Sequence, residues 1–288
     1  MSRTPRPDVV YGVDLSAAAT SAGTDTWVAR CLLDGDALVV DELASAAEFL
    51  GLDSTDREDA LPALATHVGG VDGPAVAGID VPFSLPAWVL GDRTWREFVE
   101  ATPERWGVLD GVDDPRDLYD AVREAADAGR PVRRATDDDH GGQDPAGFRI
   151  KTQTYYGISV LLRRLIERAG VCVPPALPAS AVAADPLPRL AVLETYPASV
   201  FDRLDGADRT GYKKSQRRHV QARRRNVAAL ADAGVRFAAE AARDCAVASD
   251  DALDAVAAAY AAARNYRTAI DPGGDPDARE RREARIYA

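Results

Sequence analysis

The sequence predicts an α/β protein with a mixed five-stranded sheet, antiparallel strands at one edge and helices on both faces. Three observations lead to this fold class. Three strand-like segments come first and are joined by short connections, and helical and strand-like segments then alternate. Several of the strand-like runs are almost continuously apolar, as in strands that are buried on both faces. The 288 residues suffice for one large domain with a substantial core.

The first strand is predicted from an apolar run rich in β-branched residues, which begins at Val9. The turn Asp34-Gly35-Asp36 separates the next two strands, and because Gly and Asp tolerate positive φ it indicates an antiparallel hairpin. Pro82 and Pro197 end the last two strands abruptly. The predicted strands cover residues 9–15, 26–33, 37–43, 75–83 and 190–196.

Apolar residues at helical spacing predict five helices. The clearest stripe contains Ile158, Leu161, Leu162 and Leu165, which lie on one face of a helix. The predicted helices cover residues 55–68, 115–128, 155–169, 215–233 and 249–266.

The domain organisation follows from where this patterning stops. Residues 88–150 are polar and punctuated by Gly, Pro and Asp, which indicates an insertion after the fourth strand rather than a domain with its own core. We therefore expect one domain over residues 9–270 that contains this insertion. Residues 1–8 and 271–288 are expected to be polar tails, the latter loosely held.

Composition indicates a cytoplasmic protein without a membrane partner. No apolar run approaches the length of a membrane helix, no secretory leader is recognisable, and three widely spaced cysteines predict no disulfide framework. Acidic residues number 46 against 35 basic ones, which gives a net charge of −11 and a composition like that of proteins from salt-loving organisms. Taken as an average, this charge argues against a nucleic-acid partner.

The basic residues are concentrated in one segment, which reverses that inference. Residues 209–225 contain eight basic side chains and no acidic one, so the remaining chain carries −19. A block of one sign weakens a helix by itself and suits contact with phosphates, although a solvated helix face is the ordinary alternative. Tyr212 and His219 in the same segment are candidates for stacking on bases. Outside this segment, Arg133 and Arg134 are candidates for contacting a phosphate backbone. The predicted nucleic-acid contacts are Lys151, Lys213, Lys214, Arg217, Arg218 and Arg223.

Acidic side chains end three of the apolar strands. The first and fourth strands carry Gly12-Val-Asp14 and Gly78-Ile-Asp80, and the fifth reaches Glu194. Ligands bind at the carboxyl ends of strands in open α/β sheets, so these positions suit a site. A lone Asp at a strand end is more often a turn former, and the prediction therefore depends on the group.

The last predicted helix adds two more acids on one face, Asp251 and Asp254. Small residues at Ala255 and Ala258 continue that face and allow the helix to approach the sheet closely. Asp251 lies in the first turn of the helix, where capping explains an acid without any metal. Asp254 lies beyond that turn, so capping does not explain it. Clustered carboxylates removed from water require protons or a cation, and all-oxygen ligands suit Mg²⁺ or Mn²⁺.

These segments resemble the family known as domain of unknown function 429. The motifs that carry the resemblance are Gly12-Val-Asp-Leu15, Gly78-Ile-Asp-Val-Pro-Phe-Ser-Leu-Pro86, Glu194-Thr-Tyr-Pro-Ala-Ser199 and residues 250–259, in this order along the chain. The family is regarded as predicted nucleases with a ribonuclease H-like fold, which implies the strand order 3-2-1-4-5. The final helix is also similar to that of Holliday-junction resolvases, and this similarity suggests a homodimer.

The resemblance implies a nuclease that cleaves phosphodiester bonds in DNA or RNA with two Mg²⁺ or Mn²⁺ ions. Asp14, as the bridging ligand, would then hold the metal together with Asp80, Asp251 and Asp254. Glu194 would hold a further ligand or orient water, because it belongs to the family's own motif but has no clear counterpart in the resolvases.

Two other functions stay open at this stage. Actin-like ATPases and sugar kinases share the topology, and the small, flexible loop at residues 16–23 follows the first strand as a phosphate loop would, although it lacks a Gly-Lys-Ser/Thr pattern. A non-catalytic module that binds nucleic acid is the other alternative, and the complete set of acids argues against it.

Overall fold

A single mixed sheet organises the chain. The computed structural model describes residues 6–182 and 187–288, and over these residues the sheet has eight strands. Seven of them lie in the order β5-β6-β4-β1-β2-β3-β7, and β8 pairs with β6. The strands are β1 (Val9–Asp14), β2 (Trp27–Asp34), β3 (Ala37–Ser45), β4 (Ala75–Asp80), β5 (Val171–Cys172), β6 (Leu190–Thr195), β7 (Val235–Phe237) and β8 (Ile286–Tyr287).

The five strands predicted from the sequence are β1, β2, β3, β4 and β6. β2 runs antiparallel to β1 and β3, whereas β4 is parallel to both β1 and β6. The prediction of an antiparallel edge is wrong, because β7 pairs in parallel with β3 and covers that edge. β5, β7 and β8 have only two or three residues each, too few for an alternating pattern to be recognised in the sequence.

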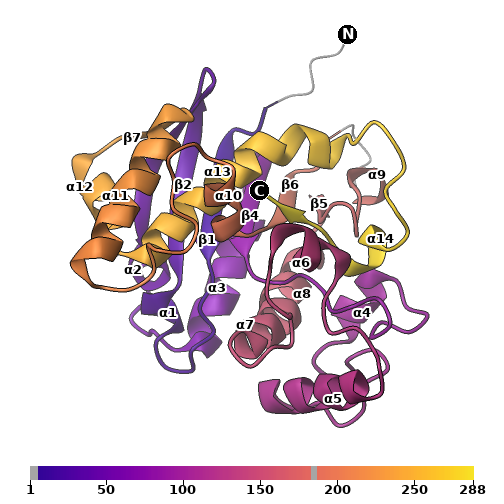
Figure 1. Cartoon of the computed structure of the whole chain (residues 1–288). Helices are drawn as coiled ribbons and strands as arrows, with labels where there is room; N and C mark the ends of the chain where they lie inside the picture. The colour runs from indigo at the N-terminus through magenta and orange to yellow at the C-terminus, as the bar shows by residue number, and fades with distance from the viewer. Residues whose placement is uncertain (1–5, 183–186) are drawn as a thin grey trace.

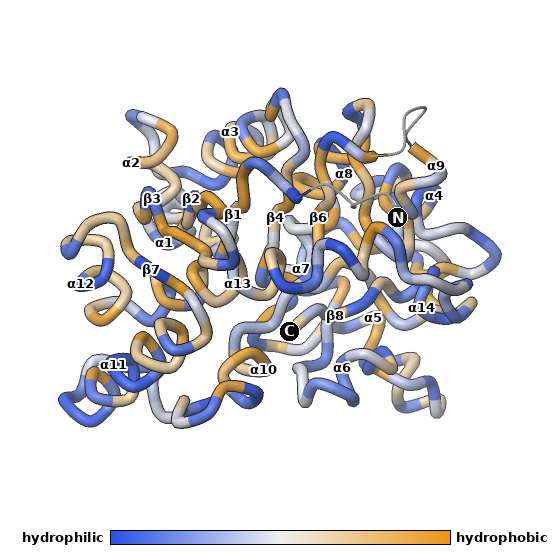
Figure 2. The backbone as a smooth tube through the Cα atoms, turned by 90° about the horizontal axis from the view of Figure 1, so that it is seen from above, coloured by the Kyte–Doolittle hydropathy of each residue, from blue (hydrophilic) through white to orange (hydrophobic). Residues whose placement is uncertain are grey.

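Helices cover both faces of the sheet, as predicted. Figure 2 shows α3 (Arg57–Gly69) and α8 (Arg163–Ile166) on one side of the row of strands and α13 (Asp250–Ile270) on the other. Two hydrophobic clusters fill these layers, one with Leu61 and Leu165 against Val13, the other with Ala255 and Ala259 of α13 against Val10. Successive residues of β1 therefore face opposite cores.

The helices otherwise follow the predicted spans with shifted ends. The predicted helix over 155–169 begins earlier, at Lys151, and passes through a π-helical turn before α8. No helix among the described residues is long and apolar enough to cross a membrane. The remaining helices are α1 (Ala22–Asp25), α2 (Ala46–Leu50), α4 (Trp95–Ala101), α5 (Pro115–Asp127), α6 (Ala135–His140), α7 (Lys151–Tyr156), η1 (Gly157–Leu162), α9 (Ala179–Val182), α10 (Pro197–Asp202), α11 (Arg217–Asp232), α12 (Glu240–Ala248) and α14 (Glu280–Glu283).

The segment predicted as an insertion packs against the main core. It contains α4, α5 and α6, which lie on the side of the molecule away from α11 and α12 (Figure 1). Trp95, Phe98 and Trp106 are buried in the same cluster as the strand residues Val13 and Ile79. The segment therefore shares the core of the sheet.

The predicted C-terminal tail is in fact docked onto the sheet. β8 pairs in parallel with β6, so that Ile286 lies opposite Glu194, and the Ile286 side chain is only 4% exposed. Glu283 of α14 accepts hydrogen bonds from the amides of Ala87 and Ala135. The apolar residues that anchor the tail are too few to stand out from its charged sequence. Of the predicted N-terminal tail, residues 1–5 lie outside the described residues, and Arg6 pairs with Asp36.

Two glycines set the distance between the sheet and α13. A Cβ atom on Gly12 of β1 would lie 1.9 Å from the carbonyl oxygen of Ala255, and one on Gly78 of β4 would lie 2.3 Å from that of Ala258. Only glycine can therefore occupy these strand positions, because the helix backbone lies where a side chain would begin. The small residues of α13 complete this close contact.

Candidate metal centre

Two of the predicted ligands lie side by side at the ends of parallel strands. Asp14 of β1 is in register with Asp80 of β4, so both side chains point to the same face of the sheet. Each follows its glycine by two residues, so the carboxylates project toward the layer where Gly12 and Gly78 admit α13. The Gly-x-Asp pattern thus combines close helix packing with a carboxylate at the strand end.

The third carboxylate comes from α13. Ser249 caps this helix by accepting a hydrogen bond from the amide of Ala252 at 3.1 Å. Asp254 follows in the second turn, where it is fully buried at 0% exposure, and Asp14 is 9% exposed. One carboxylate oxygen from each of Asp14, Asp80 and Asp254 lies within 4.8 Å of the others. These three residues form a buried acidic triad that could hold a metal ion.

A recess of about 180 Å³ leads to the triad. Asp251, one turn before Asp254, lines this recess without joining the three clustered oxygens. Thr195 and Gln153 line it from β6 and α7. The structure thus brings together three of the four predicted metal ligands and places the fourth at the same recess.

The family assignment agrees with the sequence resemblance. Residues 161–277 match a family model described as "Protein of unknown function (DUF429)". This segment of the chain is similar to the DUF429 family. The matched segment includes Glu194, Asp251 and Asp254, whereas β1 and β4, with Asp14 and Asp80, lie before it. No curated protein and no solved structure matches the chain.

Both carboxylate oxygens of Asp254 are engaged by neighbouring residues in the loop before α11. The Tyr212 hydroxyl donates to Oδ1 at 2.9 Å, and the Lys213 ammonium lies 2.7 Å from Oδ2. Tyr212 is fully buried, so the prediction that it stacks on bases is wrong. It is instead a part of the site that sequence reasoning missed, because nothing in the sequence connects it with an acid 42 residues away.

Burial and mutual repulsion raise the pKa values of these acids. Burial raises the pKa of Asp14 well above its usual range, and the charges of Asp254 and Asp80 raise it further. Burial likewise raises the pKa of Asp80 to about 7, against the opposing effect of Lys213, and that of Asp251 to about 6. Four carboxylates face one ammonium group, so the fully ionised site lacks positive charge.

The contribution of Asp80 to the stability of the metal-free protein is therefore expected to fall as the pH rises. The ordinary pKa of an Asp side chain is 3.8, whereas that of Asp80 in the folded protein is about 7. Between these two pH values the folded state therefore binds more protons than the unfolded state. The contribution of Asp80 is complete below pH 4 and is lost as the pH passes 7. Melting temperatures in a chelator, measured from pH 4 to pH 8 for the wild type and Asp80→Asn, isolate this effect. We expect the advantage of Asp80→Asn to grow with pH, and a constant difference would contradict the account.

Glu194 lies outside the triad because its side chain starts on the other face of the sheet. It is in register with Ile79, one residue before Asp80. Its two oxygens accept hydrogen bonds from Arg134 at 2.7 and 2.5 Å, and the amide of Phe83 donates to it at 2.9 Å. Glu194 still lines the recess, but its oxygens are occupied. The predicted role as a free ligand or as a residue that orients water is thus replaced by a buried ion pair.

Arg134 is a buried structural cation, so the prediction that it contacts a phosphate backbone is wrong. It is 0% exposed and also pairs with Asp137 of α6 at 2.6 Å. Burial lowers the pKa of its guanidinium, but the charges of Glu194 and Asp137 raise it more, so the group stays charged. The same side chain donates to the carbonyl of Glu283 and so connects the docked C-terminus with the site. Sequence reasoning missed this because residues 137–142 look like an exposed loop.

The six predicted nucleic-acid contacts have different environments. Lys214, Arg217 and Arg218 are exposed. They follow Lys213 in the sequence, and Lys213 lines the recess. Lys151 is half-buried and lies 4.0 Å from the ring centre of Phe148. Arg223 is 2% exposed and binds backbone carbonyls, so its prediction as a nucleic-acid contact is wrong. His219 is also buried, against its predicted role in stacking, and pairs with the carbonyl of Gly211.

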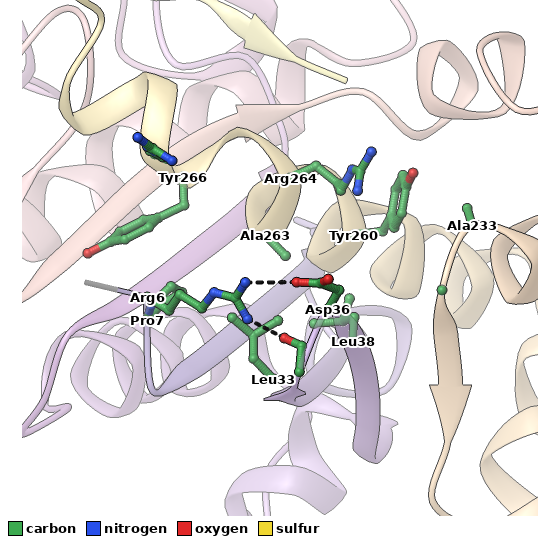
Figure 3. A pocket seen from close by; sticks show the side chains of 13 residues that line it. Arg6, Pro7, Leu33, Asp36, Leu38, Ala233, Tyr260, Ala263, Arg264 and Tyr266 are labelled. Carbon is green, nitrogen blue, oxygen red and sulfur yellow. Dashed lines mark hydrogen bonds and ion pairs between the residues drawn. The ribbon is translucent and has the colours of Figure 1, made fainter. Parts of the chain in front are cut away.

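A larger hollow of about 900 Å³ lies elsewhere, between the β2–β3 hairpin and the second half of α13. Figure 3 shows Arg6 reaching across it to Asp36 beside Leu33, with Tyr260 and Arg264 along the helix. Its single acidic lining residue is already paired with Arg6. Among the described residues, the clustered carboxylates lie at the recess at the other end of α13 and not at this hollow.

Proposed function

We propose that this protein is a divalent-metal-dependent nuclease that hydrolyses phosphodiester bonds in DNA or RNA. The observation that carries the proposal is the buried triad of Asp14, Asp80 and Asp254, whose oxygens lie within 4.8 Å of one another. The neighbouring strands β3-β2-β1-β4-β6, with β2 antiparallel, support a ribonuclease H-like arrangement for this site. Lys214, Arg217 and Arg218 are exposed and follow the recess residue Lys213 in the sequence, and they would supply the second requirement, a surface for phosphates.

The donor set fits hard divalent ions. Carboxylate oxygens are the ligands that Mg²⁺ and Mn²⁺ prefer, and no sulfur or imidazole is among the three clustered groups. Asp14, Asp80 and Asp254 would hold the metal, with Asp251 available at the mouth for a second ion. Bound there, such ions supply a Lewis acid that activates water and stabilises the departing oxygen of a phosphodiester.

The residues around the triad position the substrate. Lys214, Arg217 and Arg218 would attract the phosphate backbone to the segment that follows Lys213, against the repulsion from the acids. The recess has a volume of about 180 Å³, which limits entry to a small part of the substrate. The buried position of the acids keeps bulk water away, which strengthens the interactions of charges within the site.

We prefer this function to the ATPase or kinase alternative because of the loop after β1. In that loop the Ser16 amide donates to the Thr26 hydroxyl at 3.0 Å. A Cβ atom on Gly23 would lie 2.9 Å from the Thr55 backbone, so the glycine of this loop is buried against the chain rather than open to a phosphate. The acids also favour catalysis over a binding module, because a surface that only binds phosphates gains nothing from buried negative charge.

The proposal predicts cleavage that depends on the metal. Labelled single-stranded, duplex, hybrid and branched DNA and RNA are incubated with the full chain at low ionic strength, since salt weakens phosphate contacts. We expect products with Mg²⁺ or Mn²⁺ and none with a chelator. Charge reversal at Arg217 and Arg218 should weaken binding of the cleaved substrate. If folded protein that binds Mn²⁺ leaves the whole panel intact, the proposed activity is wrong.

A further inference from the structure

One cation lies within the acidic triad itself. The Lys213 ammonium is 2.7 Å from Asp254, and the charges of Asp254, Asp80 and Asp14 together raise the pKa of Lys213 against the effect of burial. The two partners differ in burial, since the Lys213 side chain is 52% exposed whereas that of Asp254 is 0% exposed. A side chain that is half exposed to solvent therefore places its ammonium group on a fully buried carboxylate.

The loop around Lys213 is held in a strained form. Lys214 has φ 119°, in the region that residues other than glycine rarely adopt. Strain of this kind persists only where surrounding contacts enforce it, and it is concentrated at functional sites. Here the strained residue directly follows the one that enters the triad.

Arg223 supplies the contacts that enforce this loop. Its Nη1 donates to the carbonyls of Tyr212 and Lys214, on either side of Lys213, at 2.6 and 2.8 Å. Its Nε and Nη2 donate to the carbonyls of Val247 and Ala248, at the end of α12 and next to the start of α13. One buried guanidinium thus fixes the loop with Lys213 relative to the helix with Asp254.

We propose that Lys213 is a tethered counter-ion that competes with the divalent ion for Asp254 and thereby sets the metal affinity of the site. The inference rests on the metal site of the proposed function. Oδ1 of Asp254 already accepts the Tyr212 hydroxyl, so Oδ2 is the oxygen that both cations need. An ammonium group and a divalent ion on one oxygen repel each other strongly in a buried site. The metal ion therefore binds as Lys213 withdraws into solvent.

Binding of Mn²⁺ tests this competition without any nuclease assay. The signal of free Mn²⁺ in electron paramagnetic resonance is titrated with wild-type protein, Lys213→Met, Lys213→Arg and Arg224→Met. Arg224→Met removes a positive charge from an exposed residue of α11, which makes it the control. We expect Lys213→Met to bind Mn²⁺ roughly tenfold more tightly than the wild type. Lys213→Arg and Arg224→Met should stay near the wild type.

Thermal unfolding gives a second readout. In a chelator, Lys213→Met should melt below the wild type because the triad has lost its cation, and Mn²⁺ should raise its melting temperature by more. Equal or weaker Mn²⁺ binding by Lys213→Met, with the wild type binding normally, would overturn the role of Lys213 and leave the proposed function standing. If neither protein binds Mn²⁺, the metal site is wrong, and both proposals fall together.

Discussion

Asp14→Asn is expected to abolish metal-dependent cleavage while making the metal-free protein more stable. The variant keeps the size of the side chain but removes one ligand charge from the triad, so catalysis should fall by roughly 10³-fold or more. The same change removes an acid whose pKa is raised by burial and by repulsion from Asp254 and Asp80. At pH 8 in a chelator the melting temperature should therefore rise by a few degrees.

The opposite signs of these two effects distinguish a site residue from a structural one. Asp244→Asn serves as the control, because Asp244 is exposed on α12 and lies outside the recess. It should change neither cleavage nor melting temperature. A loss of cleavage by Asp14→Asn together with a lower melting temperature in the chelator would indicate misfolding. It would also contradict the proposed repulsion among the buried acids.

Gly12→Ala is expected to destabilise the fold strongly. The new Cβ would lie 1.9 Å from the Ala255 carbonyl oxygen and 2.4 Å from the Ala259 amide nitrogen, both of them backbone atoms. Either β1 or α13 has to move, which should cost at least about 3 kcal/mol and lower the melting temperature by roughly 6–12 °C. Movement of α13 also displaces Asp254, so the affinity for Mn²⁺ should fall.

Gly274→Ala is the matched control for this prediction. Gly274 is exposed, and a Cβ atom there would meet nothing within 4 Å. Its effect on the free energy of unfolding should stay within about 0.5 kcal/mol. A Gly12→Ala protein as stable as Gly274→Ala would show that the helix does not press on the strand as described.

The triad was accessible from the sequence because its signals are local. Gly12-Val-Asp14 and Gly78-Ile-Asp80 each combine a buried strand with an acid at its end, and Asp254 interrupts a helix of small apolar residues. Charge in such places is costly unless something offsets it, so its presence points to a function. Element order then indicated that the three segments meet.

Glu194 shows where this reasoning fails. Its strand looks like the other two, but the face on which a side chain points depends on the register between strands, and a shift of one residue reverses it. Glu194 is paired with Ile79 rather than Asp80 and therefore faces Arg134. The register is decided by long-range pairing, which a single sequence does not reveal.

Long-range partners also explain the errors in the basic segment. Arg223 and Arg217 look alike in the sequence, yet the first binds carbonyls from two other segments and the second is exposed. The docked C-terminus was missed for the same reason, since β8 has two residues and exists only by pairing with β6. Charge composition predicted a phosphate surface but could not assign each cation to it.

The proposed metal site is tested most directly by a crystal structure of the protein soaked in Mn²⁺, with the metal located by anomalous scattering. We expect Mn²⁺ between the carboxylates of Asp14, Asp80 and Asp254, with the Lys213 ammonium withdrawn from Asp254. A structure at saturating Mn²⁺ that shows no metal among these carboxylates, and Lys213 still paired with Asp254, would contradict the proposed site.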